Sequence, residues 1–194
     1  MLDLRSHLAS LKSAVAQIGV ASGFLYGVFE YEHSKFDQQV KQTLEFYDRF
    51  NSSPYVGYRE TFSNVRYENI RILSKSAEST EAYNSAIDKI IKLEGTKLTT
   101  SLDMTFDFFD GLTNCVRSGL CDSVSAKRLF RYRAQEIYEN FWPHIENIRT
   151  TYKMDKPTCS GNVFNIYAGG LFYVARCIED KSFLTRLRWK VFSP

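Results

Sequence analysis

Residues that interrupt helices are scarce in this sequence, which has only four prolines and ten glycines among 194 residues. Proline removes a backbone donor and glycine adds conformational freedom, so long stretches with neither favour long helices. No stretch shows the apolar–polar alternation that predicts a half-buried strand. The sequence therefore predicts an all-α protein with one sizeable hydrophobic core.

A strong excess of one charge is also missing. The 25 basic and 22 acidic side chains leave a formal net charge of +3, which is too small to indicate a nucleic-acid partner. The motifs H-E-x-x-H and G-x-S-x-G and a glycine-rich nucleotide loop are absent. We therefore expect neither an enzyme nor a bound cofactor.

Cysteines are few, and their spacing fits no familiar framework. Cys115, Cys121, Cys159 and Cys177 form neither paired C-x-x-C zinc ligands nor the dense pattern of small secreted proteins. Two disulfides are possible if the domain faces an oxidising compartment. The favoured interpretation is four free, buried thiols.

A long uncharged run extends from Ser13 to Phe29. Within it, Gly19, Gly23 and Gly27 are spaced four residues apart, which clears side chains from one face of a helix. Such a glycine zipper is typical of transmembrane helices that pack closely together. Residues 13–29 are therefore predicted to span a membrane once. A buried core helix is the alternative, because about 17 residues is the lower limit for a span.

Gln17 bears on what this span contacts. An amide that faced lipid would be costly, whereas one directed at a neighbouring helix can form a hydrogen bond. We group Gln17 with the glycine zipper, in a contact with another membrane subunit or a second copy of the chain. No cleavage signal follows the run, so the segment is expected to remain as an anchor.

The absence of proline extends over residues 2–50, where apolar residues recur at heptad-like spacing. This pattern predicts one helix about 70 Å long, at about 1.5 Å per residue. Beyond the span, the helix would continue as a stalk through Phe36, Val40, Leu44 and Tyr47. We assign residues 1–50 to this long helix and residues 51–194 to a bundle of about five helices.

Turn residues separate the predicted bundle helices. The turn Asn51–Pro54 ends the long helix, Gly95 and Gly119 end two later ones, and Pro143 kinks another after Trp142. The expected helices cover residues 58–74, 79–93, 99–117, 122–152 and 162–180.

Three groups of polar residues could support chemistry. Asp103, Asp107 and Asp110 share one side of a helix and could bind a divalent cation. A solvated or ion-paired face is favoured for them, opposite arginines of the next helix. His144 is expected to be partly buried near the kink rather than a general base. A third group is a basic and aromatic stretch that consists of Lys127, Arg128, Phe130, Arg131, Tyr132 and Arg133. Such a stretch could bind nucleic acid. The favoured interpretation is an amphipathic helix with a basic outer face.

The membrane orientation depends on weak signals. Arg5 and Lys12 precede the span and Lys35 and Lys41 follow it, so the positive-inside rule gives a tie. The C-terminal tail is basic and aromatic, which suits the anionic surface of an inner leaflet. It slightly favours a cell inner membrane location with the bundle on the cytoplasmic side, although an ordinary terminal helix packed on the bundle is the favoured interpretation of the tail. The tail residues concerned are Arg186, Arg188, Trp189 and Lys190.

Three stretches together resemble a family of small uncharacterised bacterial proteins. The resemblance covers residues 41–152. It implies one N-terminal membrane segment followed by a helical domain, and it carries over no activity and no functional residue. The stretches are Thr43-Leu44-Glu45 with Phe50-Asn51-Ser52 and Arg59-Glu60; Phe106 to Asp122, ending in Ser118-Gly119-Leu120-Cys121-Asp122; and Phe141-Trp142-Pro143-His144-Ile145 with Arg149.

These observations lead to one hypothesis and one alternative from another class. The hypothesis is a single-pass, membrane-anchored helical protein without enzymatic activity. It would act by association, as an accessory or scaffold subunit of a membrane protein assembly, with the bilayer and other subunits or itself as partners and no nucleic acid. The alternative is a soluble helical domain that binds a small ligand or nucleic acid, with its first helix buried in its own core.

Overall fold

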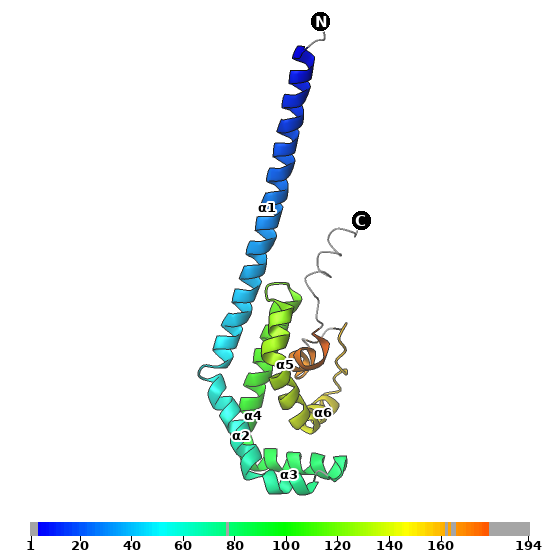
Figure 1. Ribbon diagram of the computed structural model, residues 1–194. Helices are drawn as coiled ribbons and strands as arrows, with labels where there is room; N and C mark the ends of the chain where they lie inside the picture. Colours follow the sequence, from blue (N-terminus) through cyan, green and yellow to red (C-terminus); the bar gives the residue numbers. More distant parts are fainter. Residues whose placement is uncertain (1–3, 77, 162, 164–165, 179–194) are drawn as a thin grey trace. The chain divides into compact units, whose positions relative to one another are not determined.

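The computed structural model describes residues 4–76, 78–161, 163 and 166–178, and of residues 4–18, 20 and 21 it describes the backbone alone. All regular structure in this part of the chain is helical, as predicted (Figure 1). The chain divides into two compact units, residues 1–39 and 40–194. Helix α1 (Leu4–Phe50) begins in the first unit and ends in the second.

Helix α1 ends where the sequence predicts it. The Asn51 side-chain amide donates to the Tyr47 carbonyl at 2.9 Å, and the Ser52 hydroxyl donates to the Arg49 carbonyl at 2.9 Å. Both carbonyls also accept the backbone amides of Asn51 and Ser52, so the side-chain bonds reinforce the last turn of the helix. Pro54, which follows, has no N–H to continue the ladder.

The structure gives no support to the predicted membrane span. Within the described part of the chain, no helix has both the length and the apolar character that crossing a membrane requires. The side chains of residues 13–18, 20 and 21, which belong to the predicted span, lie outside that part.

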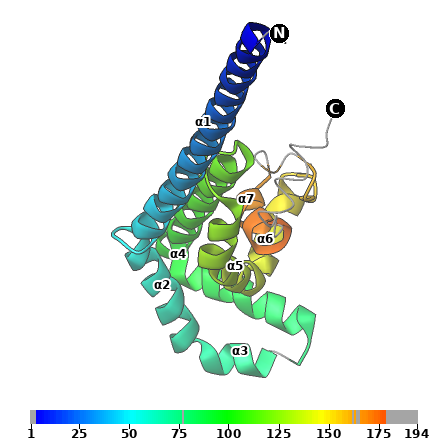
Figure 2. The same ribbon diagram turned by 45° about the horizontal axis from the view of Figure 1, so that its top comes forward.

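Helix α4 is the central element of the second unit (Figure 2). It contacts α2, α3, α5, α6 and α7, so helices from both ends of the unit pack on it. The elements after α1 are α2 (Tyr55–Glu68), α3 (Ile70–Ser76), α4 (Thr80–Arg117), α5 (Ser123–Asn140), α6 (Trp142–Thr151), α7 (Gly169–Phe172) and the π-helix η1 (Tyr173–Cys177).

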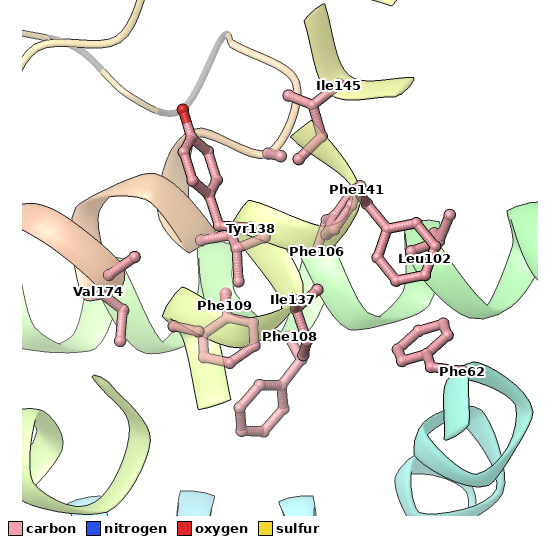
Figure 3. Packing of buried hydrophobic residues seen from close by; sticks show 14 of the residues in the cluster. Phe62, Leu102, Phe106, Phe108, Phe109, Ile137, Tyr138, Phe141, Ile145 and Val174 are labelled. Carbon is pink, nitrogen blue, oxygen red and sulfur yellow. The ribbon is translucent and has the colours of Figure 1, made fainter. Parts of the chain in front are cut away.

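A group of phenylalanines forms the centre of the core. Phe108 and Phe109 of α4 pack with Phe50 of α1 and Phe130 of α5, and Figure 3 shows the two α4 rings among their neighbours. The ring centroids of Phe50 and Phe108 are 4.9 Å apart. Phe109 and Phe130 have no exposed surface. Because Phe50 is also buried, the end of α1 contributes to the core of the second unit.

The helix break predicted at Gly95 is confirmed, and two other predicted helices are divided. Gly95 interrupts the element labelled α4 between the helices expected at 79–93 and 99–117, with a non-helical φ of 62° and ψ of −143°, a conformation open essentially to glycine. The helix expected at 58–74 is divided at Asn69, whose amide donates to the Val65 carbonyl at 2.9 Å. The helix expected at 122–152 is divided at Phe141 into α5 and α6.

The predicted helix at 162–180 is confirmed only in part. Among the described residues of this range, Val163 and residues 166–168 are not helical, whereas α7 and η1 cover residues 169–177. A Cβ atom on Gly169 would collide with the backbone of Val163. The chain thus turns back tightly on itself here, and local propensity alone does not show this.

The preference for free thiols was also wrong. All four cysteines lie in the described part of the chain and are paired, Cys115 with Cys121 and Cys159 with Cys177.

Candidate functional site

The predicted carboxylate row on α4 faces the segment before η1. Asp110 accepts a hydrogen bond from the Gly170 amide at 2.7 Å, and the buried Thr113 hydroxyl donates to the Gly170 carbonyl at 3.0 Å. A Cβ atom on Gly170 would stand 2.6 Å from the Asp110 Cα. Only glycine fits at this contact. The two bonds therefore fix the backbone of Gly170 against α4.

The Asp110 carboxyl is partly buried at this contact. Burial raises the pKa of Asp110 to about 6, the Gly170 amide opposes the rise, and the nearby Asp107 adds to it. Asp107 itself is exposed. The predicted pairing of this row with the arginines of the next helix is absent for Asp103 and Asp110, whose described hydrogen bonds go to the segment 166–170 instead.

Asp103 binds a tyrosine that the sequence analysis did not single out. The Tyr167 hydroxyl donates to Asp103 at 2.7 Å. Burial, and then the Asp103 carboxylate, raise the pKa of Tyr167. The hydroxyl thus remains protonated and serves as a donor at neutral pH. The Tyr167 ring also packs against Phe106, with ring centroids 5.2 Å apart.

Arg149 of α6 is almost completely buried, with 2 % of its surface exposed. Its Nε and Nη2 donate to the Tyr167 carbonyl at 3.0 and 2.7 Å, while Nη1 is buried without a hydrogen-bond partner. The side chain also lies beside the Trp142 ring, 5.7 Å from its centroid. These two donors of one guanidinium group bind the same carbonyl and so hold the loop before α7 against α6.

His144 is buried rather than partly buried as predicted, with 9 % of its surface exposed. Its ring centroid lies 6.2 Å from that of Tyr167 in an edge-on arrangement, and its Nε2 has no hydrogen-bond partner. Burial lowers the pKa of His144, against the opposing effect of Asp103 and Asp88. The side chain is thus neutral at pH 7, and no described group orients it as a general base.

These residues form a structural contact between three parts of the chain. Tyr167 connects α4 through Asp103 to α6 through Arg149, and Gly170 adds a second connection to α4. No group of three or more His, Cys, Asp and Glu side chains in the described part of the chain could hold a metal ion. Their described contacts hold the segment 166–170 against α4 and α6.

The basic stretch of α5 borders a shallow, open depression of about 420 Å³. Phe130, expected to alternate with the basic residues, has no exposed surface and belongs to the core. Arg133 pairs with Glu136 at 2.9 Å. Of the two aromatic residues in the stretch, only Tyr132 is exposed and able to stack on a base. The depression is lined by Lys127, Arg128, Arg131, Tyr132 and Gln135.

The described part of the glycine zipper is exposed. A Cβ atom on Gly19, Gly23 or Gly27 would meet no atom within 4 Å. Around the glycines, Phe24, Leu25 and nearby aromatic side chains are largely exposed. The Gln17 side chain lies outside the described residues, as does the tail that contains Arg186, Arg188, Trp189 and Lys190.

The predicted stalk residues lie on both sides of the boundary between the two units. Phe36, in the first unit, is 44 % exposed. Val40 is partly buried and Leu44 is largely exposed. Tyr47 stacks edge-on against Phe130, with ring centroids 6.0 Å apart. A role of these side chains in assembly stays a prediction.

A family model described as "Domain of unknown function (DUF4760)" matches residues 14–159. The chain belongs to this family. No curated protein and no solved structure matches it. The match confirms the resemblance to an uncharacterised family, and it extends beyond residues 41–152 on both sides. In this DUF4760 chain, several residues of the resembling stretches have structural roles: the Thr43 hydroxyl accepts from the Asp122 amide at 2.9 Å, and Arg149 holds Tyr167.

Tyr167, Gly169 and Gly170 are the site residues that the sequence analysis missed. The one available signal was the pair of adjacent glycines, which is unfavourable inside a helix and frequent at close backbone contacts.

Proposed function

We propose that this DUF4760 protein acts by association, as a membrane-anchored accessory or scaffold subunit of a membrane protein assembly. Helix α1 would be the element that contacts lipid and the partner. The observation that carries the proposal is the exposed apolar surface of α1. Its large side chains there are 66 to 72 % exposed, namely Phe24, Leu25, Tyr26 and Phe29.

The distribution of these side chains around the helix favours a bilayer over a single protein partner. Each residue of an α-helix is rotated by about 100° about the helix axis from the one before. The apolar side chains of Phe24, Leu25, Tyr26 and Phe29 therefore cover a sector of about 200°. The three glycines, Gly19, Gly23 and Gly27, lie in the remaining sector. A helix that is apolar nearly all round is normally covered on every side. Lipid would cover the wide sector, and the glycine sector would allow another helix to approach closely.

The uncharged run supports the same proposal. From Ser13 to Phe29 no residue carries a charge, so insertion would leave no ion in the hydrocarbon. Tyr26 and Tyr31, which are 68 and 66 % exposed, stand near one end of the run, where the aromatic belt of a span is found.

Two measurements on the full chain test the proposal. After carbonate washing, the protein should sediment with membranes, and a chain released into the supernatant would contradict the anchor. In detergent, Gly23→Ile should weaken assembly at least tenfold, because the added side chain fills the glycine sector, while the helical circular dichroism stays unchanged.

Ser22→Ile is the matched control, since it adds similar bulk in the wide, lipid-facing sector of the same exposed helix. Ser22→Ile should assemble like the unaltered chain. Equal assembly of all three proteins would exclude the glycine contact. Equal weakening by both substitutions would show that bulk anywhere on α1 disturbs assembly, and would also count against it.

A further inference from the structure

We infer that the helical unit, residues 40–178, works in an oxidising compartment, on the side of the membrane away from the cytoplasm. The compartment follows from the cysteines alone, and the reference to a membrane rests on the proposed function. The observation is that two disulfides use all four cysteines of the chain.

The first bridge lies at the turn between α4 and α5. The amides of Leu120 and Cys121 both donate to the Cys115 carbonyl at 3.0 Å, and Gly119 supplies the positive φ that the turn needs. The backbone thereby holds the two cysteines close together. Cys115 and Cys121 are 8 and 3 % exposed. The bridge is thus buried, although residues 117–120 of the turn between the two cysteines are exposed.

The second bridge fixes the segment that carries the Tyr167 and Gly170 contacts. Cys159 and Cys177 are 18 residues apart in sequence, and the described chain between them is irregular as far as Ala168 and helical from Gly169. A covalent link between its ends restricts the unfolded chain and thereby stabilises the folded segment. Cys177 is 7 % exposed and lies in η1, which contacts α5.

Other roles for these cysteines fit less well. A catalytic or redox-sensing thiol is accessible and has a partner that stabilises the thiolate, whereas three of these four side chains are buried. Metal binding is not supported either, since no suitable cluster occurs in the described residues. Buried bridges that stabilise a small domain persist in oxidising compartments and are rare in reducing ones.

Formation of each bridge has a simple balance. Two thiols lose two protons and two electrons as the sulfur–sulfur bond forms. A disulfide-bearing thiol oxidoreductase of that compartment accepts the protons and the electrons and becomes a dithiol.

The charges beside the uncharged run, residues 13–29, do not oppose this orientation. Two basic residues precede the run, Arg5 and Lys12, and two follow it, Lys35 and Lys41.

The test uses the full chain in the cells that produce it. Thiols are trapped with acid, the protein is denatured, and a polyethylene glycol maleimide is added with or without prior reduction. We expect no mass shift without reduction and four shifts after it. The variant Cys159→Ser should give one shift without reduction, because Cys177 loses its partner. Four shifts without reduction in the unaltered chain would overturn the inference.

Failure of this inference is distinguishable from failure of the proposed function. A chain that sediments with membranes but carries four free thiols would keep the anchor and contradict the compartment. A chain released by carbonate with no free thiol would keep the compartment and contradict the anchor.

Protease accessibility tests the orientation of the membrane-bound protein. A protease is added outside intact cells from which any outer barrier has been removed. It should digest the helical unit, and full protection of that unit would overturn the orientation.

Discussion

At the scale of single residues, Asp110 combines two opposing effects. Its carboxylate fixes Gly170 by accepting the amide hydrogen at 2.7 Å, yet burial makes the negative charge unfavourable. The pKa of about 6 lies above the ordinary value of 3.8, so the folded state holds the proton more tightly than the unfolded state. Stability from this group is therefore present below about pH 4 and is lost as the pH rises through 6.

We predict that Asp110→Asn stabilises the protein at pH 7. The amide oxygen can still accept from Gly170, and no charge is buried. A shift of about two units corresponds to about 3 kcal/mol, which we reduce to about 1 kcal/mol because the group is partly solvated. Urea unfolding of the oxidised chain at pH 7 and pH 4 measures this gain in the free energy of unfolding. The gain should vanish at pH 4, and the exposed Asp155→Asn should show none at either pH.

At the scale of elements, one hydroxyl adds a hydrogen bond to the aromatic contacts between α1 and α5. Thr43 has no exposed surface, and its oxygen accepts the Asp122 amide at 2.9 Å. Asp122 is in turn the N-cap of α5, because its carboxylate accepts from the Ser125 amide at 2.7 Å. This bond thus helps to hold the start of α5 against the last turns of α1.

Thr43→Val should lower the free energy of unfolding by about 1–3 kcal/mol. The substitution keeps the shape of the side chain and leaves the Asp122 amide buried without this acceptor. Thr105→Val is the matched control, since the equally buried Thr105 hydroxyl donates only to the Ser101 carbonyl within its own helix. We expect the control to change stability by less than about 0.5 kcal/mol in urea unfolding. Equal losses would refute the role of Thr43.

The elements also show how far a sequence can be interpreted. Helix α1 was predictable through Phe50, because the absence of proline and the turn residues after it are local signals. The break before Gly169 was not, because it depends on contacts with Val163 and with Asp110, which is distant in sequence. The contact between Tyr167 and Asp103 joins residues 64 positions apart. The pairing of Cys159 with Cys177 likewise depends on how the chain after α6 reverses.

At the scale of the whole molecule, the two compact units contribute unequally to the core. In the described part of the chain, every buried side chain lies between Thr43 and Ile178. The first unit contributes none, and its described side chains from Ser22 to Gln38 are exposed. Folding of the second unit should therefore not require the first.

A chain that lacks residues 1–35 should test this independence. With both disulfides formed, we expect the same cooperative thermal transition, within about 4 °C, and the same near-ultraviolet circular dichroism, because no core residue is removed. Sedimentation with membranes should be lost. A broad, non-cooperative transition would show that residues 1–35 contribute to the fold.

The bridge between Cys159 and Cys177 has a practical consequence for anyone who purifies this protein. If a protease cuts the backbone once between these two residues, the pieces remain covalently joined through sulfur. Such nicked molecules would migrate as intact polypeptide on a gel run without reductant. They would separate into two fragments only after reduction, so integrity of the preparation has to be judged on reduced samples.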